Sequence, residues 1–447
     1  MSSSPGPKGH PLHGSWPEFR ADPLAFLLDG TLAYGDFFRF RLGLQQCFAV
    51  SDPAAIQKVF SDREGFTDKT PPHRMQDAYP RSVARLEGSE HLERRRALAP
   101  AFQREAVLAR AEGAARVVRE ALGRLRTGEA RAALPALEDV ALRSASMLLL
   151  GDAGERVVEH IATELPRVEA WLGHAADDEA AYDQAREALA ASIREAAEHR
   201  RAAGSPGTTD LLDPLVRAVD AGQMDEQAMI DEIVMMLVTH VPTAAASAWA
   251  LYELAQRPEV RSSLEEELDA TGAHGAEVER ASLLSAVVLE TLRLHPPVWV
   301  LAREARRDFR HGPHAVIAGN EVLVSPYVMQ RLPRYWKRPE AFLPERFLPG
   351  SPWHEERPSA AFLPFGLGIR KCIGERTAIL QMKLMLAALV RGFRFELPAG
   401  YEAGIGGRRP LVPRDGLPLL LERRSRTERW LRGDAVAGGA AVSAPSR

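Results

Sequence analysis

The sequence predicts a mainly α-helical protein with small peripheral β-sheets, on three observations. Residues from Ser89 to Leu283 show helical periodicity almost without interruption. Short strand-like segments occur only before and after this region. No glycine- or serine-rich linker and no internal repeat divides the 447 residues, so we expect a single domain over residues 1–432. Residues 433–447 are small and polar, and we expect a disordered tail there.

The region before Ser89 alternates between strands and a helix. The segments FFRFRLG (37–43) and QQCFAVS (45–51) have the pattern of two short strands joined at Gly43. A short helix follows in DPAAIQKVFS, where Asp52 is placed to cap the N-terminus. Three prolines then mark residues 66–82 as a loop.

The central region consists of helices, and one of them contains a proline. Helical periodicity covers residues 89–102, 105–125, 137–150, 176–203, 210–219, 237–254, 258–271 and 283–297. Segment 237–254, LVTHVPTAAASAWALYEL, is expected to be one continuous helix despite Pro242. An interior proline removes a backbone donor and clashes with the preceding turn, at a cost of roughly 3 kcal/mol. A kink with a water-filled groove is therefore expected.

The C-terminal third contains short strands and one more long helix. Strands are expected at residues 309–319, 320–327, 393–398 and 417–424. The irregular, proline-rich residues 334–352 precede a helix that is expected to begin near Cys372. These elements complete the mainly helical pattern with small sheets at its edge.

Composition and charge exclude several classes of protein. With 45% hydrophobic and 26% charged residues, the chain has the balance of a globular protein with a large core. A formal net charge of −3 argues against general nucleic-acid binding. The two cysteines, Cys47 and Cys372, make no disulfide framework, which favours the cytoplasm. The N-terminus has no apolar run of signal-peptide or membrane-anchor length, so we expect a soluble protein.

The most specific stretch is the glycine-rich loop FLPFGLGIRKCIG (362–374), which contains Cys372. A thiolate at a helix N-terminus is favoured by backbone N–H groups and by the helix dipole. One cysteine cannot build a zinc or iron–sulfur site, and no C-x-x-C motif is present. The loop glycines permit close approach by a large flat ligand. A single thiolate and a porphyrin are consistent with this pattern.

The loop resembles the haem-binding signature of the cytochrome P450 family, F-x-x-G-x-R-x-C-x-G, at every fixed position. The resemblance covers nearly the whole chain. It implies the P450 fold, with haem b (iron protoporphyrin IX) buried between a long distal helix and the helix after the cysteine. It also implies Cys372 as the axial ligand of the iron, Phe365 beside the sulfur and Arg370 on a haem propionate. Gly366 and Gly374 are the remaining cofactor-binding positions of the loop.

Other positions resemble the family's propionate-binding residues and its donor-binding face. His91 and Arg95 share a helix face, as the family's propionate-binding pair does, although a solvated basic helix would give the same pattern. Arg303 falls where the family usually places another propionate-binding arginine. The family binds a ferredoxin or flavodoxin-like electron donor on a basic face near the cysteine. Candidates for this face are Arg94, Arg96, Arg370, Lys371, Arg376 and Lys383.

A second constellation resembles the family's structural triad. Glu290 and Arg293 lie at i and i+3 among apolar neighbours, so they share one helix face and are expected to be buried. They match the family's E-x-x-R, and Arg346 in FLPERF matches its third member. A buried ion pair needs such further partners to offset its desolvation. The triad is expected to hold the haem-binding core and to take no part in the chemistry.

Segment 237–254 resembles the family's distal helix, whose usual pattern A-G-x-(D/E)-T carries protons to bound dioxygen. Aligned without a gap on AWALYEL, Pro242 takes the place of the alcohol and Val241 that of the acid. The other catalytic positions of this atypical helix are Val238, Thr239 and Thr243. A one-residue slip would make Thr243 the alcohol. His240 matches a histidine that is common in the family and generally not catalytic. The proline either fixes a distortion that the family helix already has or marks an enzyme without the usual relay.

These observations favour a haem-thiolate oxidoreductase, and above all a monooxygenase that hydroxylates or epoxidises an apolar small molecule in secondary-metabolite biosynthesis. We expect a cytoplasmic monomer. A peroxide-driven reaction, or an oxidative coupling or rearrangement, is the alternative, because these bypass proton delivery. Some family members that use peroxide carry Arg-Pro at these positions, whereas Val241 precedes Pro242 here. A non-catalytic haem-binding sensor is a remote alternative. Candidates for substrate contact are Met75, Trp171, Val298 and Leu301, for which core packing is the competing interpretation.

Overall fold

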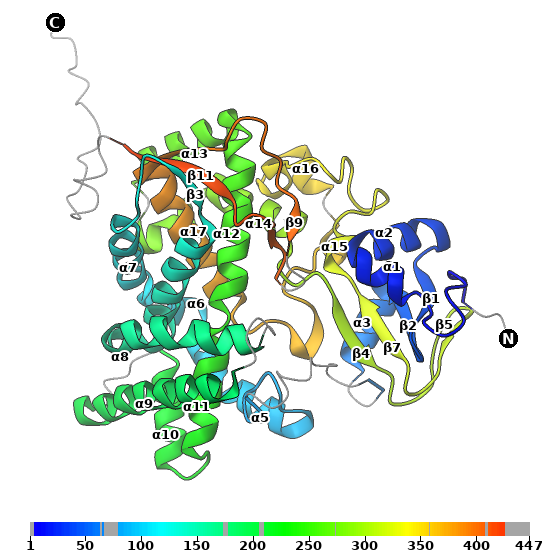
Figure 1. Ribbon diagram of the computed structural model, residues 1–447, viewed down its shortest axis with the longest axis horizontal. Coiled ribbons are helices and arrows are strands. Elements are labelled where there is room, and N and C mark those ends of the chain that lie inside the picture. Colours follow the sequence, from blue (N-terminus) through cyan, green and yellow to red (C-terminus); the bar gives the residue numbers. More distant parts are fainter. Residues whose placement is uncertain are drawn as a thin grey trace, which may run out of the picture.

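The computed structural model describes residues 4–62, 65–66, 79–172, 178–204, 210–272, 274–356, 358–406 and 410–424. Figure 1 shows a smaller N-terminal lobe built on a sheet and a larger lobe built from helices. The mainly helical class with small sheets is therefore confirmed. The expected tail at residues 433–447 and the substrate candidate Met75 lie outside the described residues.

The N-terminal lobe is organised by a four-stranded sheet in the order β1-β2-β7-β4. β1 (Phe37–Leu42) and β2 (Gln45–Val50) pair antiparallel. β2 pairs in parallel with β7 (Glu321–Val324), which pairs antiparallel with β4 (Leu301–Glu304). The sheet therefore joins segments far apart in the sequence, and β4 carries Arg303 into the protein interior.

The longer helices contain most of the described chain. They are α2 (Pro23–Tyr34), α3 (Pro53–Ser61), α5 (Gly88–Leu98), α7 (Ala111–Gly123), α8 (Leu134–Leu172), α9 (Glu179–Ala203), α10 (Leu212–Asp220), α11 (Glu226–Leu237), α12 (His240–Ala255), α13 (Pro258–Thr271), α14 (Ser282–Leu294) and α17 (Glu375–Gly392). Shorter helices are α1 (Trp16–Ala21), α6 (Arg104–Ala109), α15 (Pro326–Met329) and α16 (Pro352–Glu355). Short 3-10 turns are η1 (Ala99–Phe102), η2 (Gly275–Arg280), η3 (Pro344–Phe347), η4 (Ser359–Ala361) and η5 (Gly368–Arg370). As predicted, Asp52 caps α3 by accepting from the Ala55 N–H at 2.7 Å.

Smaller sheets close the fold. β3 (Ala130–Ala132), β11 (Pro418–Arg423) and β8 (Phe393–Glu396) form one sheet in that order. β5 (Phe309–His311) pairs with β6 (His314–Val316), and β9 (Ile405–Gly406) pairs with β10 (Val412–Pro413). The expected strands at 393–398 and 417–424 are confirmed, whereas residues 309–319 form a hairpin because Gly312 turns the chain with a φ of 54°.

Helix α8 reverses direction at Gly151, whose φ of 60° and ψ of −146° are not helical. A side chain there would disfavour the positive φ. The two halves lie side by side, because Arg143 in the first half bonds Glu159 in the second at 2.6 Å. The reversal brings the end of the helix, around Glu169, against the start of α12.

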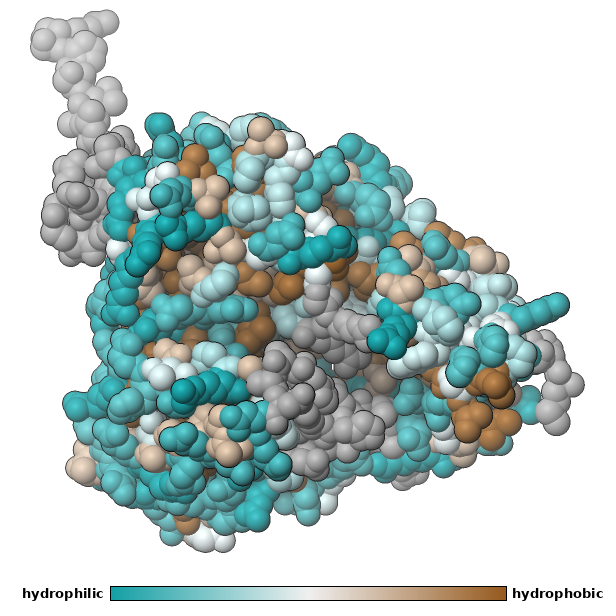
Figure 2. All heavy atoms as spheres, viewed as in Figure 1, coloured by the Kyte–Doolittle hydropathy of each residue, from teal (hydrophilic) through white to brown (hydrophobic). Residues whose placement is uncertain are grey.

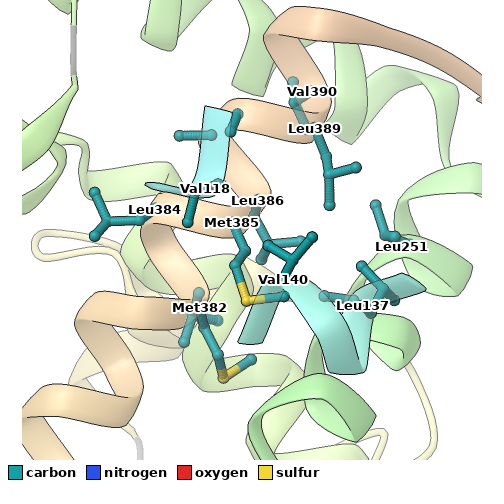
Figure 3. Packing of buried hydrophobic residues seen from close by; sticks show 14 of the residues in the cluster. Val118, Leu137, Val140, Leu251, Met382, Leu384, Met385, Leu386, Leu389 and Val390 are labelled. Carbon is teal, nitrogen blue, oxygen red and sulfur yellow. The ribbon is translucent and has the colours of Figure 1, made fainter. Parts of the chain in front are cut away.

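The main hydrophobic core packs around α17 (Figure 3). Met382, Met385 and Leu386 of α17 lie among apolar side chains of the surrounding helices. The partners labelled in Figure 3 are Val118 of α7, Leu137 and Val140 of α8 and Leu251 of α12. This packing fixes α17, and with it the loop that contains Cys372, against the central helix α12.

The segment Glu226–Ala255, which comprises α11 and α12, has the length and hydropathy of a membrane span. However, 72% of its apolar window is buried inside the protein. Figure 1 shows α12 running through the middle of the helical lobe, as a core helix does.

Candidate active site

The cysteine loop (residues 362–374) follows a path that requires glycine. Gly366 and Gly368 both have a φ of 70°. A Cβ on Gly368 would lie 2.3 Å from the carbonyl oxygen of Phe60. The Cys372 N–H donates to the Phe365 carbonyl at 2.9 Å, which closes the loop. These two glycines are therefore needed for the conformation of the loop itself.

Cys372 is an exposed residue, although its thiol is desolvated. The residue is exposed, but desolvation by the surrounding protein raises the pKa of its thiol. The Gly374 N–H lowers this pKa, as do the charges of Arg95 and Lys371. α17 begins at Glu375 and not at Cys372, so the helix terminus alone does not hold the sulfur as a thiolate.

The surroundings of this sulfur fit a large thiolate-bound group. Gly374 presents no side chain, and a Cβ there would lie 3.9 Å from Cys372 Sγ. Phe365 is half-buried and packs against the main core. Thiolate is a ligand that haem iron takes in proteins. The residues that are present therefore fit a haem bound through Cys372.

Two arginines lie against the cysteine loop. Arg95 of α5 donates to the Lys371 carbonyl at 2.7 Å. Burial lowers the pKa of Arg95, and the nearby Cys372 opposes that shift. Arg370 donates to the Val83 carbonyl at 2.9 Å and also to the carbonyl of Leu86. The structure therefore places the Arg95 guanidinium near the sulfur, whereas that of Arg370 reaches the segment that contains Val83 and Leu86.

The other two residues expected at the propionates lie on separate elements. Arg303 of β4 donates to the Ala302 carbonyl at 2.8 Å, and its guanidinium lies 4.2 Å from the centroid of the Phe60 ring. Phe60 also supplies the carbonyl against which Gly368 packs, so Arg303 borders the cysteine loop. His91 of α5 is buried, at 1% exposure.

The three members of the expected structural triad are in contact and buried. Glu290 accepts from Arg293 Nε at 2.7 Å and from Arg293 Nη2 at 2.8 Å. Arg346 Nε donates to the same carboxylate at 3.3 Å, and so does the Leu343 N–H at 2.8 Å. Burial raises the pKa of Glu290, and its arginine partners oppose that rise. Because Arg293 and Arg346 also bond backbone carbonyls before the cysteine loop, the triad ties α14 to that segment.

The continuous helix expected at residues 237–254 is wrong, because the helix breaks before the proline. α11 ends at Leu237, residues 238–239 form a turn, and α12 begins at His240. A proline ring clashes with the carbonyl four residues earlier, here that of Val238, and the helix ends at that point. Pro242 is thus the third residue of α12, where a missing N–H costs little because first-turn donors have no intrahelical acceptor.

Carbonyl groups at the break find partners within the chain. The Val238 carbonyl, expected to lose its donor, accepts from the Val241 N–H at 3.3 Å. Side chains serve others: Thr239 Oγ1 donates to Met236 (2.5 Å), His240 Nδ1 to Leu237 (2.9 Å) and Thr243 Oγ1 to Thr239 (3.3 Å). The carbonyl groups released by the break therefore accept hydrogen bonds from nearby hydroxyl and imidazole groups.

The break is also where this central segment reaches open space. Residues 228–237 and 243–251 are all buried. Between them, Val238, Val241 and Pro242 are half-buried and Thr239 is exposed. Figure 2 shows a hollowed region with apolar surface between the helical lobe and the N-terminal sheet. Four of the five distal-helix positions singled out in the sequence thus have accessible surface, and the fifth, Thr243, is buried.

A carboxyl group that the sequence pattern does not indicate lies at this break. Glu169 of α8 places Oε1 3.6 Å from Nδ1 of His240. Burial raises the pKa of Glu169 to about 8 and lowers that of His240 to about 4. Both groups are therefore neutral near pH 7. His240 is evident in the sequence, but its partner comes from another helix and becomes visible only in the folded protein.

The expected basic face is smaller than the sequence suggests. Lys383 is buried and bonds Glu279 at 2.7 Å, so its placement on that face is wrong. Its position in α17 faces η2, which the sequence pattern did not reveal. Arg94 is half-buried and bonds Glu232 at 3.1 Å. The exposed cations that remain are Arg96, Lys371 and Arg376.

The other candidates for substrate contact differ in exposure. Trp171 stacks on Tyr182, with ring centroids 4.0 Å apart. Val298 is 40% exposed and Leu301 is half-buried next to Gly366. Val298 and Leu301 therefore have accessible apolar surface, and Leu301 borders the cysteine loop, whereas the half-buried Trp171 packs on a neighbouring ring.

Comparison with known proteins gives a consistent result. The family model of Cytochrome P450 matches residues 4–403. Cytochrome P450 4V2 of Homo sapiens is 34% identical over 228 residues, which are 49% of this chain and 43% of that protein. Putative cytochrome P450 132 of Mycobacterium tuberculosis is 34% identical over 230 residues, which are 50% of this chain and 49% of that protein. The match spans less than half the length of each of these two relatives.

One relative and one solved structure match over most of their length. Cyclooctatin synthase of Streptomyces melanosporofaciens is 27% identical over 413 residues, which are 87% of this chain and 89% of that protein. The structure of retinoic acid bound cyanobacterial CYP120A1 has a TM-score of 0.79 and 23% identity, and the match covers 95% of this chain and 100% of that one. At that identity the structural likeness shows the fold.

Proposed function

Because this chain belongs to the cytochrome P450 family and is an oxidoreductase, we propose that it is a haem-thiolate monooxygenase that hydroxylates or epoxidises an apolar small molecule. The observation that carries the proposal is Cys372, an exposed residue in a loop that contains Arg370 and whose Lys371 carbonyl is bound by Arg95. A haem held there supplies the activation of dioxygen with two electrons.

The residues proposed to hold haem b divide by chemistry. Cys372 would bind the iron, and Phe365, Gly366 and Gly374 would leave room beside it. Arg95 and Arg370 would bind the propionates, because a guanidinium has five N–H donors and the carbonyls that they contact use only some of them. Further propionate-binding residues are proposed at His91 and Arg303.

The substrate proposed is apolar and belongs to secondary metabolism. Val238, Val241 and Pro242 present apolar surface where the distal helix breaks, and a pocket of this kind favours apolar ligands. Val298 and Leu301 would extend the same surface. The similarity to cyclooctatin synthase over most of both chains supports a role in the synthesis of a natural product.

Members of the family use redox partners, and we propose an acidic ferredoxin or flavodoxin-like donor for this chain. Its docking site would be the face that carries Arg96, Lys371 and Arg376, all exposed. Charge complementarity of this kind raises the rate of encounter more than the affinity.

A second candidate function is a peroxide-driven reaction, or an oxidative coupling or rearrangement. It is favoured by the distal helix, in which Val241 and Pro242 supply neither an acid nor an alcohol. Peroxide delivers two electrons and two protons with the oxygen, so such a reaction needs less proton supply from the protein.

Reconstitution with haem tests the proposal. The ferrous–CO spectrum should show a thiolate ligand, which Cys372→Ser should abolish and Cys47→Ser, a change at a distant buried cysteine, should leave intact. A panel of apolar terpenoids is then screened for shifts of the Soret band. Compounds that shift it should incorporate one atom of labelled dioxygen when ferredoxin and reductase are supplied. Turnover with hydrogen peroxide alone would favour the second candidate, and failure to bind haem would exclude both.

A further inference from the structure

Glu169 and His240 meet where the distal helix is broken. Glu169 lies in the last turn of α8, which ends at Leu172. Its Oε1 is 3.6 Å from Nδ1 of His240, the first residue of α12. His240 directly follows the exposed Thr239. Figure 1 shows α8 crossing the end of α12 beside α11, so the pair belongs to the protein interior next to the open turn.

The imidazole of His240 has a defined role in this contact. Its Nδ1 is 2.9 Å from the Leu237 carbonyl. A carbonyl only accepts hydrogen bonds, so Nδ1 carries the proton. The side chain is buried, and burial keeps it neutral near pH 7. The N–H closest to Glu169 is therefore uncharged and already bonded, and it offers little stabilisation to a carboxylate.

The groups around Glu169 leave its negative charge uncompensated. Oε1 is buried and has no hydrogen-bond partner among the described residues. Its neighbours are Glu138 of α8, Tyr79 and His240. Tyr182 and Arg186 of α9 and Asp231 of α11 lie around Tyr79. Glu138 disfavours ionisation, and Arg186 bonds Tyr182. Glu169 therefore keeps a proton near neutral pH, while 21% of its side chain stays exposed.

We propose that Glu169 is the proton-carrying residue of the distal site, in place of the acid and alcohol missing at residues 241 and 242, and that His240 is its positioning residue. The inference rests on the proposed monooxygenase function, because dioxygen-driven turnover needs this supply and peroxide-driven turnover needs less. His240 acts by filling the space beside Oε1 with an uncharged ring whose orientation the Leu237 carbonyl fixes.

The step is a proton transfer with no change in oxidation state. The O–H bond of Glu169 breaks, and the proton passes to a water molecule at the exposed turn of Thr239. Proton transfer through one ordered water is within the usual reach of a general acid. The carboxylate then takes a proton from bulk water through its exposed part. The charge therefore exists only briefly in the protein interior, where it is costly.

An infrared titration of the haem-loaded protein tests the protonation state directly. Wild-type protein should show the carbonyl stretch of a protonated carboxyl group, which disappears as pH rises through about 8. Because burial also raises the pKa of Glu138, Glu232 and Glu290, the band is identified in difference spectra. It should appear in wild type minus Glu169→Gln and be absent from wild type minus Glu164→Gln. Glu164 is the matched control, because it lies on the same helix but bonds Arg167 at 3.1 Å. A difference spectrum of wild type minus Glu169→Gln without this band would overturn the proposal, whatever the outcome for catalysis.

Substrate-free turnover with ferredoxin and reductase tests the use of the proton. Electrons are then divided between hydrogen peroxide and water, and water formation needs more protons. Glu169→Gln should lower the ratio of water to peroxide formed by about tenfold or more, since a positioned acid accelerates proton transfer by roughly 10²-fold at least. Glu169→Asp, which keeps the acid at a shorter reach, should give a smaller loss. Glu164→Gln should match wild type.

The two proposals fail separately. If wild type consumes no dioxygen with ferredoxin and reductase, either alone or with a compound that shifts the Soret band, the monooxygenase function is wrong. The infrared band then still decides whether Glu169 holds a proton. If wild type consumes dioxygen and Glu169→Gln divides electrons as wild type does, Glu169 supplies no proton and the inference is overturned. If Glu169→Gln fails to fold, the comparison of Glu169→Asp with wild type decides in the same way.

Discussion

The carbonyl of Val238 accepts a hydrogen bond from the N–H of Val241 at 3.3 Å, and this bond explains how the central helix tolerates a proline. In a regular helix the same carbonyl would pair with residue 242, which is proline and has no N–H. The chain tightens into a turn, satisfies the carbonyl one residue earlier and starts a new helix at His240. The proline therefore stands in the first turn of α12.

Pro242→Ala should change the free energy of unfolding by less than about 1 kcal/mol, because the first turn of a helix accepts proline. Urea unfolding followed by circular dichroism measures the change. Ala246→Pro is the control: it lies deeper in α12, buried, and should cost roughly 3 kcal/mol or more. If Pro242→Ala instead raised the free energy of unfolding by roughly 3 kcal/mol, the proline would be straining the helix.

Glu290→Gln should destabilise the protein by about 3–5 kcal/mol, because it leaves Arg293 and Arg346 buried without their counter-charge. The change is measured by urea unfolding. Glu345→Gln, one residue before Arg346 but exposed, should stay within about 0.5 kcal/mol of wild type. Equal stabilities of the two variants would mean that the triad adds nothing to the fold.

Elements with a strong periodic pattern could be predicted from the sequence. The hairpin of β1 and β2, the cap at Asp52 and the helix with Glu290 and Arg293 are as expected. Such features depend on neighbours within a few residues, so the local sequence contains the information. The cysteine loop is similar, because the conformations of Gly366 and Gly368 are set by the loop itself.

Features that depend on tertiary neighbours could not be predicted. The start of α12 depends on whether Thr239, His240 and Thr243 can satisfy the carbonyls released by a break. Lys383 lies in an amphipathic helix, and only the position of Glu279 shows that it faces inward. Glu169 meets His240 because α8 reverses at Gly151, far from both in the sequence.

Binding of an acidic ferredoxin should weaken as salt rises. The association rate should fall by about tenfold between low and high ionic strength, because steering by exposed charges is screened. Arg376→Gln should slow association at low salt, whereas Lys383→Gln should not, since Lys383 is buried against Glu279. Stopped-flow measurement of reduction gives these rates. Equal effects of the two substitutions would contradict the smaller basic face.

Stability should fall as pH rises toward 8, and Glu169 should account for part of the fall. Its pKa is about 8 in the folded protein and 4.5 as the ordinary value, so the folded state binds more protons between these values. The contribution of Glu169 to the free energy of unfolding is therefore complete below pH 4.5. Between pH 4.5 and about 8 it is lost at roughly 1.4 kcal/mol per pH unit. In urea unfolding at several pH values, stability should fall less steeply with pH in Glu169→Gln than in wild type, whereas Glu164→Gln should match wild type. Parallel curves for wild type and Glu169→Gln would contradict a raised pKa.

Restoring the acid and alcohol at residues 241 and 242 should make Glu169 dispensable. We expect Val241→Asp with Pro242→Thr, added to Glu169→Gln, to return the water-to-peroxide ratio to within about threefold of wild type. Both positions are half-buried and lie in the first turn of α12, where a carboxylate is favoured by the helix dipole. Val241→Asn with Pro242→Ala in the same background is the matched control, because it has similar size but no acid or alcohol. If neither pair rescues the ratio while both proteins keep the thiolate spectrum, the loss in Glu169→Gln does not come from a missing proton.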